Sequence, residues 1–290
     1  MTLIEIVAPG PLATIQDRGR PGYAHVGVPR SGAADRPSMD LANRLVGNDD
    51  SAAVIEATLG GLRIRTDTTV LVAVTGAPVP VRAGGLSVAV GTAVPLPAGA
   101  ELALGTPAHG CRTYVSVRGG FDVATTLGSR STDTLSGLGP APLSPGDVVG
   151  VGDLHGPWPA ATEAPLDSTH PDVTRLTTRA GPRRGYLADP SGLFTGEWVA
   201  TAHSNRVGVR VTRPTGSAAP VLRHRADMPE LRSEGVAHGS VQIPPGGEPV
   251  IFLADHPVTG GYPVVAVLTA SASGRAAQLA AGDRVRFVED

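Results

Sequence analysis

The sequence predicts a mostly-β protein with few, short helices. Its 290 residues include 38 Gly and 27 Pro but only 3% aromatic residues, which is typical of many turns and short strands and argues against a helical bundle. From residue 51 to about 153, short apolar or alternating runs such as VLVAV, LSVAV and YVSVRG recur. The turns between them come at roughly the 8- to 12-residue spacing of sandwiches and barrels.

One early helix is expected in the stretch DRPSMDLANRLVGN. Asp35 can cap its first turn, and Pro37 suits that turn. Gly47 or Asn48 can end the helix in the left-handed conformation. Apolar residues at helical spacing predict its buried face: Met39, Ala42, Leu45 and Val46.

The second half repeats the first in outline. IEIVAPGPLATIQ is echoed by TRLTTRAGPRRGY, QDRGRPGYAHVGV by HSNRVGVRVTRP, and LSPGDVVGV by LAAGDRVRFV. Three echoes in the same order predict a duplicated β unit. Between the halves, residues 155–171 are rich in Pro, Ala and Thr without periodicity, which indicates a linker. We therefore expect domains at 1–154 and 172–290, with a site at or near their interface.

Composition and missing motifs exclude several classes of function. A net charge of −2 gives neither a basic footprint for nucleic acid nor a polybasic membrane patch. No run of 18 apolar residues occurs and the start lacks a basic leader, so we expect a cytoplasmic protein. Every basic residue other than His is Arg, which excludes a Walker A loop and a lysine Schiff base. G-x-S-x-G, H-E-x-x-H and G-x-G-x-x-G motifs are absent, and no metal site is predicted.

The single cysteine, Cys111, excludes an intramolecular disulfide and a cysteine-based zinc site. It lies in GCRTYVSV, a predicted strand, where it is expected to be a small core residue. Catalysis by this chain would therefore use carboxylates, Arg and backbone amides.

The stretch SEGVAHGSVQIPPGGEPVIFLADHPVTGGYPVVAVL, residues 233–268, carries the strongest candidate site. The runs VIFLA and VVAVL predict buried strands. The segment between them presents polar side chains on a turn where Gly260 and Gly261 allow positive φ and close backbone approach. A hairpin with a polar tip explains the same pattern. The candidate side chains of the whole stretch are Glu234, Gln242, Asp255, Thr259 and Tyr262.

Two further polar clusters are candidates. In HSNR, residues 203–206, Arg206 can bind a carboxylate or phosphate as a fork, with Ser204 and Asn205 beside it. An ion pair at a barrel rim explains this Arg equally well. The run RVGVRV that begins at Arg206 alternates as a half-buried strand does.

The other cluster is GVPRSGAAD, residues 27–35. Ser31 and Gly32 precede the helix start, where backbone N–H groups and the positive helix end favour an anion. Helix capping alone explains Ser31 and Asp35 as well.

Several motifs together resemble a known family. They run through the whole chain in the family's order: IQDRGRPGYAHVGVPRSGAAD, LANRLVGN, EATLGG, TGA, VRGGFDV, LGSRSTD, LSPGD, SNRVGVR, LRSEGVAHGSVQIPPGGEPV and LADHPVTGGYPVVAV. On these motifs the sequence resembles the family of biotin-dependent carboxyltransferases and 5-oxoprolinase C subunits, also called allophanate hydrolase subunit 2 and including the KipA proteins.

The resemblance implies two tandem cyclophilin-like β-barrels and, as partner, the KipI-like B-type subunit of 5-oxoprolinase. With a further, A-type subunit, such an assembly hydrolyses 5-oxoproline to glutamate using ATP, which another member of the assembly can hold. A related module transfers a carboxyl group from carboxybiotin to urea, so biotin is the cofactor under that alternative. A third alternative is a non-catalytic, KipA-like regulatory partner.

The site residues receive hypothetical roles under the oxoprolinase interpretation. Arg206 binds the anionic group of substrate or phosphate, and Glu234 and Asp255 hold amide N–H groups or act as acid and base. Gln242 and Tyr262 hydrogen-bond the carbonyl.

Three departures from the family's pattern bear on these roles. Val264 stands where the family usually has Lys, Asn205 stands where Asp is common, and HPV after Asp255 replaces a more polar segment. These changes do not alter the predicted fold. They concern which substrate the site takes and whether this chain catalyses a reaction by itself.

Overall fold

The computed structural model describes residues 2–165 and 171–290, and the prediction of a mostly-β protein containing a β-barrel is confirmed. The described residues hold two α-helices, α1 (Arg36–Leu45) and α2 (Ala270–Ala277). They divide into two compact units. The second unit holds residues 171–290 together with two short segments from earlier in the chain, Pro21–Arg30 and Thr134–Ser136.

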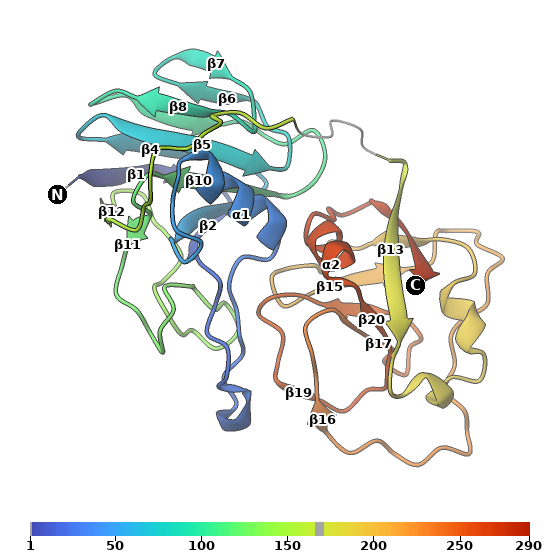
Figure 1. Cartoon of the computed structure of the whole chain (residues 1–290). Helices are drawn as coiled ribbons and strands as arrows, with labels where there is room; N and C mark the ends of the chain where they lie inside the picture. The colour runs from blue at the N-terminus through green and yellow to red at the C-terminus, as the bar shows by residue number, and fades with distance from the viewer. Residues whose placement is uncertain (1, 166–170) are drawn as a thin grey trace. The chain divides into compact units, whose positions relative to one another are not determined.

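Two antiparallel sheets form the first unit (Figure 1). The seven-stranded sheet has the order β11 (Phe121–Asp122), β12 (Val148–Val151), β1 (Leu3–Pro9), β4 (Leu62–Thr66), β9 (Glu101–Leu104), β6 (Val81–Ala83), β7 (Leu86–Val88). The five-stranded sheet has the order β2 (Leu12–Gln16), β3 (Val54–Thr58), β10 (Arg112–Val117), β5 (Val70–Gly76), β8 (Ala93–Leu96).

Both sheets contribute to one apolar core in the first unit. Ile4 and Ile64 reach it from the larger sheet, and Ile15, Ile55 and Val115 reach it from the smaller one, all without measurable exposure. Two sheets that bury their facing sides in this way stabilise each other by removing apolar surface from water. The other side of the smaller sheet carries α1, which packs on β5 and β10.

The predicted helix is confirmed in its bounds and its cap. Asp35 precedes α1, and its Oδ1 accepts a hydrogen bond from the Ser38 N–H at 3.3 Å. Met39 and Ala42 are buried against Val54 and other core residues. Gly47 follows the helix at φ 68°, the left-handed conformation that glycine tolerates.

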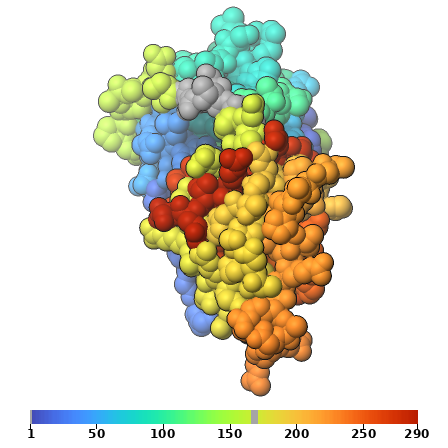
Figure 2. Space-filling model, turned by 90° about the vertical axis from the view of Figure 1, so that its right-hand side faces the viewer, coloured from blue at the N-terminus to red at the C-terminus, as the bar shows by residue number. Residues whose placement is uncertain are grey.

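A closed barrel forms the second unit, with the order β13 (Val173–Ala180), β20 (Val264–Leu268), β17 (Ser240–Gln242), β18 (Val250–Phe252), β15 (Gly208–Thr212), β14 (Trp198–Ala200), β21 (Arg284–Glu289). β13 and β21 pair in parallel, and Figure 2 shows the red C-terminal atoms beside the yellow ones of β13. Helix α2 packs on β13 and β20. The part of the chain that the structure describes also holds three short 3₁₀ turns: η1 (Ala24–Val26), η2 (Arg184–Tyr186) and η3 (Pro190–Leu193).

The alternation predicted for RVGVRV is confirmed within β15, where Val209 and Val211 are buried and Arg210 is exposed. The prediction fails at Arg206, which precedes the strand and is only 2% exposed. No helix among the described residues is long and apolar enough to cross a membrane.

The hairpin interpretation of residues 250–268 is wrong. β18 and β20 do not pair with each other, because β17 lies between them and pairs with both. The intervening loop instead forms a second ribbon, in which β19 (Thr259–Gly260) pairs with β16 (Glu234–Gly235). Residues distant in the sequence therefore meet at this loop.

Part of the predicted linker 155–171 can be placed. Residues 166–170 of this linker lie outside the described residues. Ahead of them, the Gly156 N–H donates to the Gly47 carbonyl at 3.0 Å, and the Arg118 guanidinium lies 4.4 Å from the ring centroid of Trp158. Residues 155–158 are therefore held against the first unit, and the predicted boundaries at 154 and 172 stay predictions.

Candidate functional site

A buried ion pair forms one part of the predicted site. Arg206 Nε donates to Asp255 Oδ2 at 2.8 Å, and Arg206 Nη2 donates to Asp255 Oδ1 at 2.9 Å. Both side chains are almost fully inaccessible, at 1% and 0% exposure. The backbone fixes the same two residues, because the Asp255 N–H donates to the Arg206 carbonyl at 3.1 Å.

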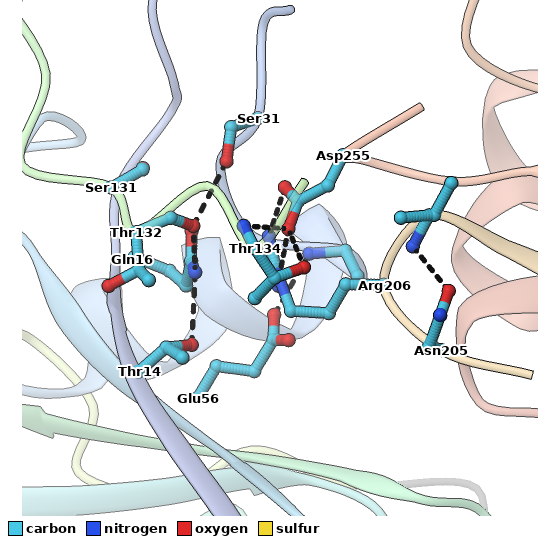
Figure 3. A network of polar contacts seen from close by, with 12 residues as sticks. Thr14, Gln16, Ser31, Glu56, Ser131, Thr132, Thr134, Asn205, Arg206 and Asp255 are labelled. Carbon is cyan, nitrogen blue, oxygen red and sulfur yellow. Dashed lines mark hydrogen bonds and ion pairs between the residues drawn. The ribbon is translucent and has the colours of Figure 1, made fainter. Parts of the chain in front are cut away.

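Thr134 is the third member of this cluster (Figure 3). Its backbone N–H and its Oγ1 both donate to Asp255 Oδ2, at 2.9 and 2.7 Å. Asp255 therefore accepts these four hydrogen bonds and holds the segment Thr134–Ser136, which belongs to the second unit. A buried carboxylate with this set of donors is well suited to positioning a loop.

Glu234 lies on the β16–β19 ribbon and remains partly accessible. Arg183 Nη2 and Nε donate to its Oε2 at 2.7 and 3.0 Å, and the Glu234 side chain is 22% exposed. The hydrogen bond with Glu234 raises the pKa of Arg183 above its ordinary value. Backbone pairing places Glu234 opposite Gly260 and Gly235 opposite Thr259. The ribbon thus joins one predicted carboxylate to the predicted Gly-rich loop.

The Gln242 side chain packs against the backbone at Gly260. The Gln242 Nε2 donates to the Tyr262 carbonyl at 2.9 Å, and a Cβ on Gly260 would lie 2.8 Å from that nitrogen. Close approach is therefore confirmed at Gly260. The expectation of positive φ is wrong for both Gly260 and Gly261, neither of which adopts it. The Tyr262 side chain is 47% exposed, and Thr259 is exposed as well.

Ser204 and Asn205 shape the turn before β15. Asn205 Oδ1 accepts from the backbone N–H groups of Val207 and Gly208, at 2.8 and 3.2 Å. Ser204 Oγ donates to the Thr201 carbonyl at 2.9 Å. Local hydrogen bonds of this kind fix the turn that delivers Arg206 to Asp255.

The remaining predicted residues, Ser31, Gly32 and Asp35, belong to the first unit. Ser31 Oγ donates to the Thr132 carbonyl at 3.1 Å, and Ser31 itself has φ 54°. A Cβ on Gly32 would lie 2.9 Å from the Gly19 nitrogen, so this position has no room for a side chain.

The hydroxyl of Tyr114 links the start of α1 to a buried carboxylate. The Asp35 N–H donates to Tyr114 Oη at 2.8 Å, and that hydroxyl donates to Glu56 Oε2 at 2.9 Å. Burial raises the pKa of Tyr114 well above its ordinary value, and the charges of Glu56 and Asp35 add to the effect. The hydroxyl is therefore a permanent donor at neutral pH.

A second polar network was not predicted from the sequence. The Asp17 carboxylate accepts from the Gly19 and Arg130 N–H groups at 2.7 and 2.6 Å, and from the hydroxyls of Ser129 and Ser131 at 2.6 and 2.5 Å. The available signal was the pair of polar motifs IQDRGRP and LGSRSTD in a chain of apolar strands. Arg183 and Thr134 were also missed, because neither has a local pattern that reveals its distant partner.

The site residues thus form separate groups. The second unit contains the Arg206–Asp255–Thr134 cluster and the ribbon with Glu234, while Ser31, Gly32 and Asp35 form a group of the first unit. Within residues 2–165 and 171–290, no group of three or more His, Cys, Asp or Glu side chains is arranged to hold a metal ion. Hydrogen bonding and charge are what these groups offer a ligand.

Comparison with known proteins identifies the family. Residues 26–289 match the model described as carboxyltransferase domain, subdomain A and B. The chain is 33% identical to the C subunit of 5-oxoprolinase from Escherichia coli, covering 99% of this chain and 91% of that protein. It is 32% identical to urea amidolyase of Saccharomyces cerevisiae, covering 99% of this chain but 16% of that much longer protein.

Solved structures show the same relationship. The K. lactis urea amidolyase superimposes with a TM-score of 0.89 at 30% identity, over 99% of this chain and 18% of that one. The protein TTHA0988 superimposes with a TM-score of 0.87 at 30% identity, over 99% of this chain and 56% of that one. By its sequence along nearly its whole length and by its fold, the chain belongs to the family of carboxyltransferase domains with subdomains A and B, which includes the 5-oxoprolinase C subunits.

Proposed function

We propose that this chain is the C-type subunit of a hetero-oligomeric, ATP-dependent 5-oxoprolinase that opens the lactam of 5-oxoproline to glutamate. Its partners would be the A-type subunit of that enzyme and its KipI-like B-type subunit. The observation that carries the proposal is the match to the Escherichia coli C subunit over 91% of that protein's length. A second relative named as a 5-oxoprolinase C subunit, from Haemophilus influenzae, is covered over 90%.

Glu234 is the carboxylate best placed to meet a substrate. Its side chain is partly exposed and held by Arg183, whereas the Asp255 side chain is inaccessible and engaged by four donors. A fixed carboxylate accepts a hydrogen bond from an amide N–H in a defined direction. We therefore assign Glu234 to the lactam N–H and Asp255 to positioning of the Thr134–Ser136 segment.

The residues around the predicted site do not form a recognisable triphosphate cradle. The sequence has no lysine, and the two arginines of the site are each bound to a carboxylate of this chain. Phosphate sites need cations and backbone amides that remain available to the ligand. ATP is therefore expected on another subunit, and no step of this chain's chemistry is assigned to it.

A second candidate function is transfer of a carboxyl group from biotin to a urea-type acceptor. The description of the matching family model and the similarity to urea amidolyase favour it. It predicts that the chain, with its partner, binds biotin or a biotinylated carrier. A regulatory role within the assembly is the third candidate, favoured by the saturation of Asp255 and Arg206 by partners within the chain.

The experiment that tests the proposal measures glutamate release from 5-oxoproline and ATP by the cognate A-type and B-type subunits, with and without this chain. Release that requires all three chains supports the oxoprolinase. No release, although the B-type partner co-elutes with this chain, contradicts it. Biotin binding by that complex then supports the carboxyltransferase, and its absence supports the regulatory role.

A further inference from the structure

Arg20 is a buried cation without an acidic partner. Its side chain belongs to the first unit, and the residue is 1% exposed. Nη2 donates to the Ser131 carbonyl and Nε to the Thr126 carbonyl, the latter at 3.3 Å. Nη1 is buried and has no hydrogen-bond partner, and no carboxylate among the described residues forms an ion pair with Arg20. An uncompensated buried charge is destabilising, so an anion is the natural complement.

Two neighbouring side chains carry further unused polar atoms. Among the described residues, seven buried side-chain nitrogen or oxygen atoms have no hydrogen-bond partner, and three of them are Arg20 Nη1, Gln16 Oε1 and Thr132 Oγ1. Gln16 is 0% exposed and Thr132 is 3% exposed. Native interiors rarely leave such atoms unsatisfied, and a bound water or ion is one explanation for each of them.

These three residues are bonded to one short stretch of chain. Gln16 Nε2 donates to the Thr132 carbonyl at 2.9 Å and to Thr14 Oγ1 at 2.9 Å, as Figure 3 shows. Arg20 donates to the carbonyl of the preceding residue, Ser131. Gly139 closes over the same place, because a Cβ there would lie 3.1 Å from Arg20 Nη2. Arg20 and Gln16 are therefore anchored to the carbonyls of two consecutive residues, Ser131 and Thr132.

We propose that Arg20, Thr132 and Gln16 bind a small planar oxyanion that also carries an N–H or O–H donor. The Arg20 N–H groups and the Thr132 hydroxyl would donate to the anionic oxygens, and Gln16 Oε1 would accept the ligand's own proton. Two sources have this chemistry: hydrogencarbonate, and a carboxylate beside a lactam N–H. The second source rests on the proposed function and is a molecule other than the one whose lactam N–H meets Glu234, whereas the Arg20 site itself does not rest on that function.

The test is a ¹³C NMR titration of the chain alone with ¹³C-labelled hydrogencarbonate, 5-oxoproline and acetate. Saturable binding of either of the first two is expected, and the one that binds names the source. Acetate, which has no donor for Gln16, should bind about tenfold more weakly. Because neither ATP nor other subunits are present, failure of the oxoprolinase assay would leave this result unaffected.

Thr132→Val distinguishes a ligand-binding hydroxyl from one bonded within the protein. Binding should weaken about tenfold, while the unfolding temperature of the ligand-free protein stays unchanged or rises, because valine removes an unsatisfied hydroxyl. Thr113→Val is the matched control, since its hydroxyl is also buried without a partner but lies on β10; binding should not change. Arg20→Gln should abolish binding and Arg44→Gln, at an exposed position of α1, should not.

The proposal is overturned if none of the three probes binds, or if Thr132→Val binds as the unaltered chain does. A lower unfolding temperature of ligand-free Thr132→Val would also overturn it, since the hydroxyl would then have a partner inside the protein. Internal water alone at the site is the physical alternative that these results would leave.

Discussion

Truncation of Asp255 to alanine should destabilise the second unit strongly. The substitution removes the carboxylate that receives two hydrogen bonds from the Arg206 guanidinium, which is buried at 1% exposure. It also removes the acceptor of both Thr134 donors. Breaking one side of a buried ion pair costs about 3–5 kcal/mol, because the remaining charge stays uncompensated. We expect a loss in this range in the free energy of unfolding.

Replacing both charges should be far less harmful. Arg206→Leu combined with Asp255→Leu removes the two desolvation penalties together, so the double variant should lie within about 2 kcal/mol of the unaltered protein. The difference from the sum of the single substitutions is the coupling energy of the pair. A large favourable coupling is expected because the geometry is bidentate.

The assay is urea unfolding followed by tryptophan fluorescence. Of the two tryptophans in the chain, Trp198 is 1% exposed and lies on β14 of the barrel in the second unit. A Trp158→Phe background therefore makes the signal specific for that barrel. Asp227→Ala, which removes an exposed carboxylate paired with Arg225, should change little and serves as control.

A loss below about 1 kcal/mol for Asp255→Ala would refute this reasoning, because an exposed ion pair behaves in that way. A double variant as unstable as the single one would refute the assigned cause, since removal of the second charge would then relieve nothing.

Three other expectations follow from single contacts. Gly260→Ala should lower the free energy of unfolding by about 1 kcal/mol, the worth of a displaced buried hydrogen bond, because its Cβ would lie 2.8 Å from the Gln242 side-chain nitrogen. Gly261→Ala is the control: its Cβ would have nothing nearer than 3.9 Å, so it should be neutral in the same urea titration. Burial raises the folded-state pKa of Tyr114, so the unfolded chain loses this proton at a lower pH than the folded one. The contribution of Tyr114 to stability is complete below the unfolded-state pKa, and the free energy of unfolding should fall by about 1 kcal/mol per pH unit above pH ~10. Tyr114→Phe should reduce this slope when unfolding is measured as a function of pH. Glu234→Gln should lower kcat of the reconstituted enzyme without moving the unfolding midpoint of this chain. Glu230→Gln, at an exposed position of the same region, should leave both quantities unchanged. If Glu234→Gln has the kcat of the unaltered enzyme, Glu234 is not part of the site.

Local patterns in the sequence were sufficient for the elements but not for their pairing. Helix α1 follows from its cap and its apolar spacing, because both act within a few residues. A hairpin was one interpretation of the strands VIFLA and VVAVL, yet β17 separates them. Proximity in sequence favours a hairpin, but the closed barrel gives each strand a different partner.

The repeat between the halves shows the same limit. LSPGDVVGV and LAAGDRVRFV match in sequence, and they form β12 and β21. β12 pairs with β1 antiparallel, whereas β21 pairs with β13 in parallel. The similar strands thus take corresponding partners, β1 and β13, but run in different directions relative to them, because the direction of pairing depends on where the connecting chain returns.

The candidate site was predictable by residue type and not by role. Arg206 and Asp255 were both expected to face a ligand, but 49 positions separate them and no short-range pattern couples them. Charge alone does not reveal whether a cation meets a substrate or a carboxylate of its own chain. Arg20 shows the converse case, because its lack of a carboxylate partner is visible only once the fold is known.

Loss of activity in Asp255→Ala would not by itself make Asp255 an acid or a base. Its four accepted hydrogen bonds include two from Thr134, so the substitution also releases the Thr134–Ser136 segment. Thr134→Val separates the two effects, because it removes the Oγ1 donor at 2.7 Å while leaving the Arg206–Asp255 pair in place. If Asp255 acts by positioning, Thr134→Val should lower kcat/KM without shifting the pH profile. A direct proton-transfer role requires instead that kcat survive Thr134→Val and that Asp255→Ala remove one limb of that profile.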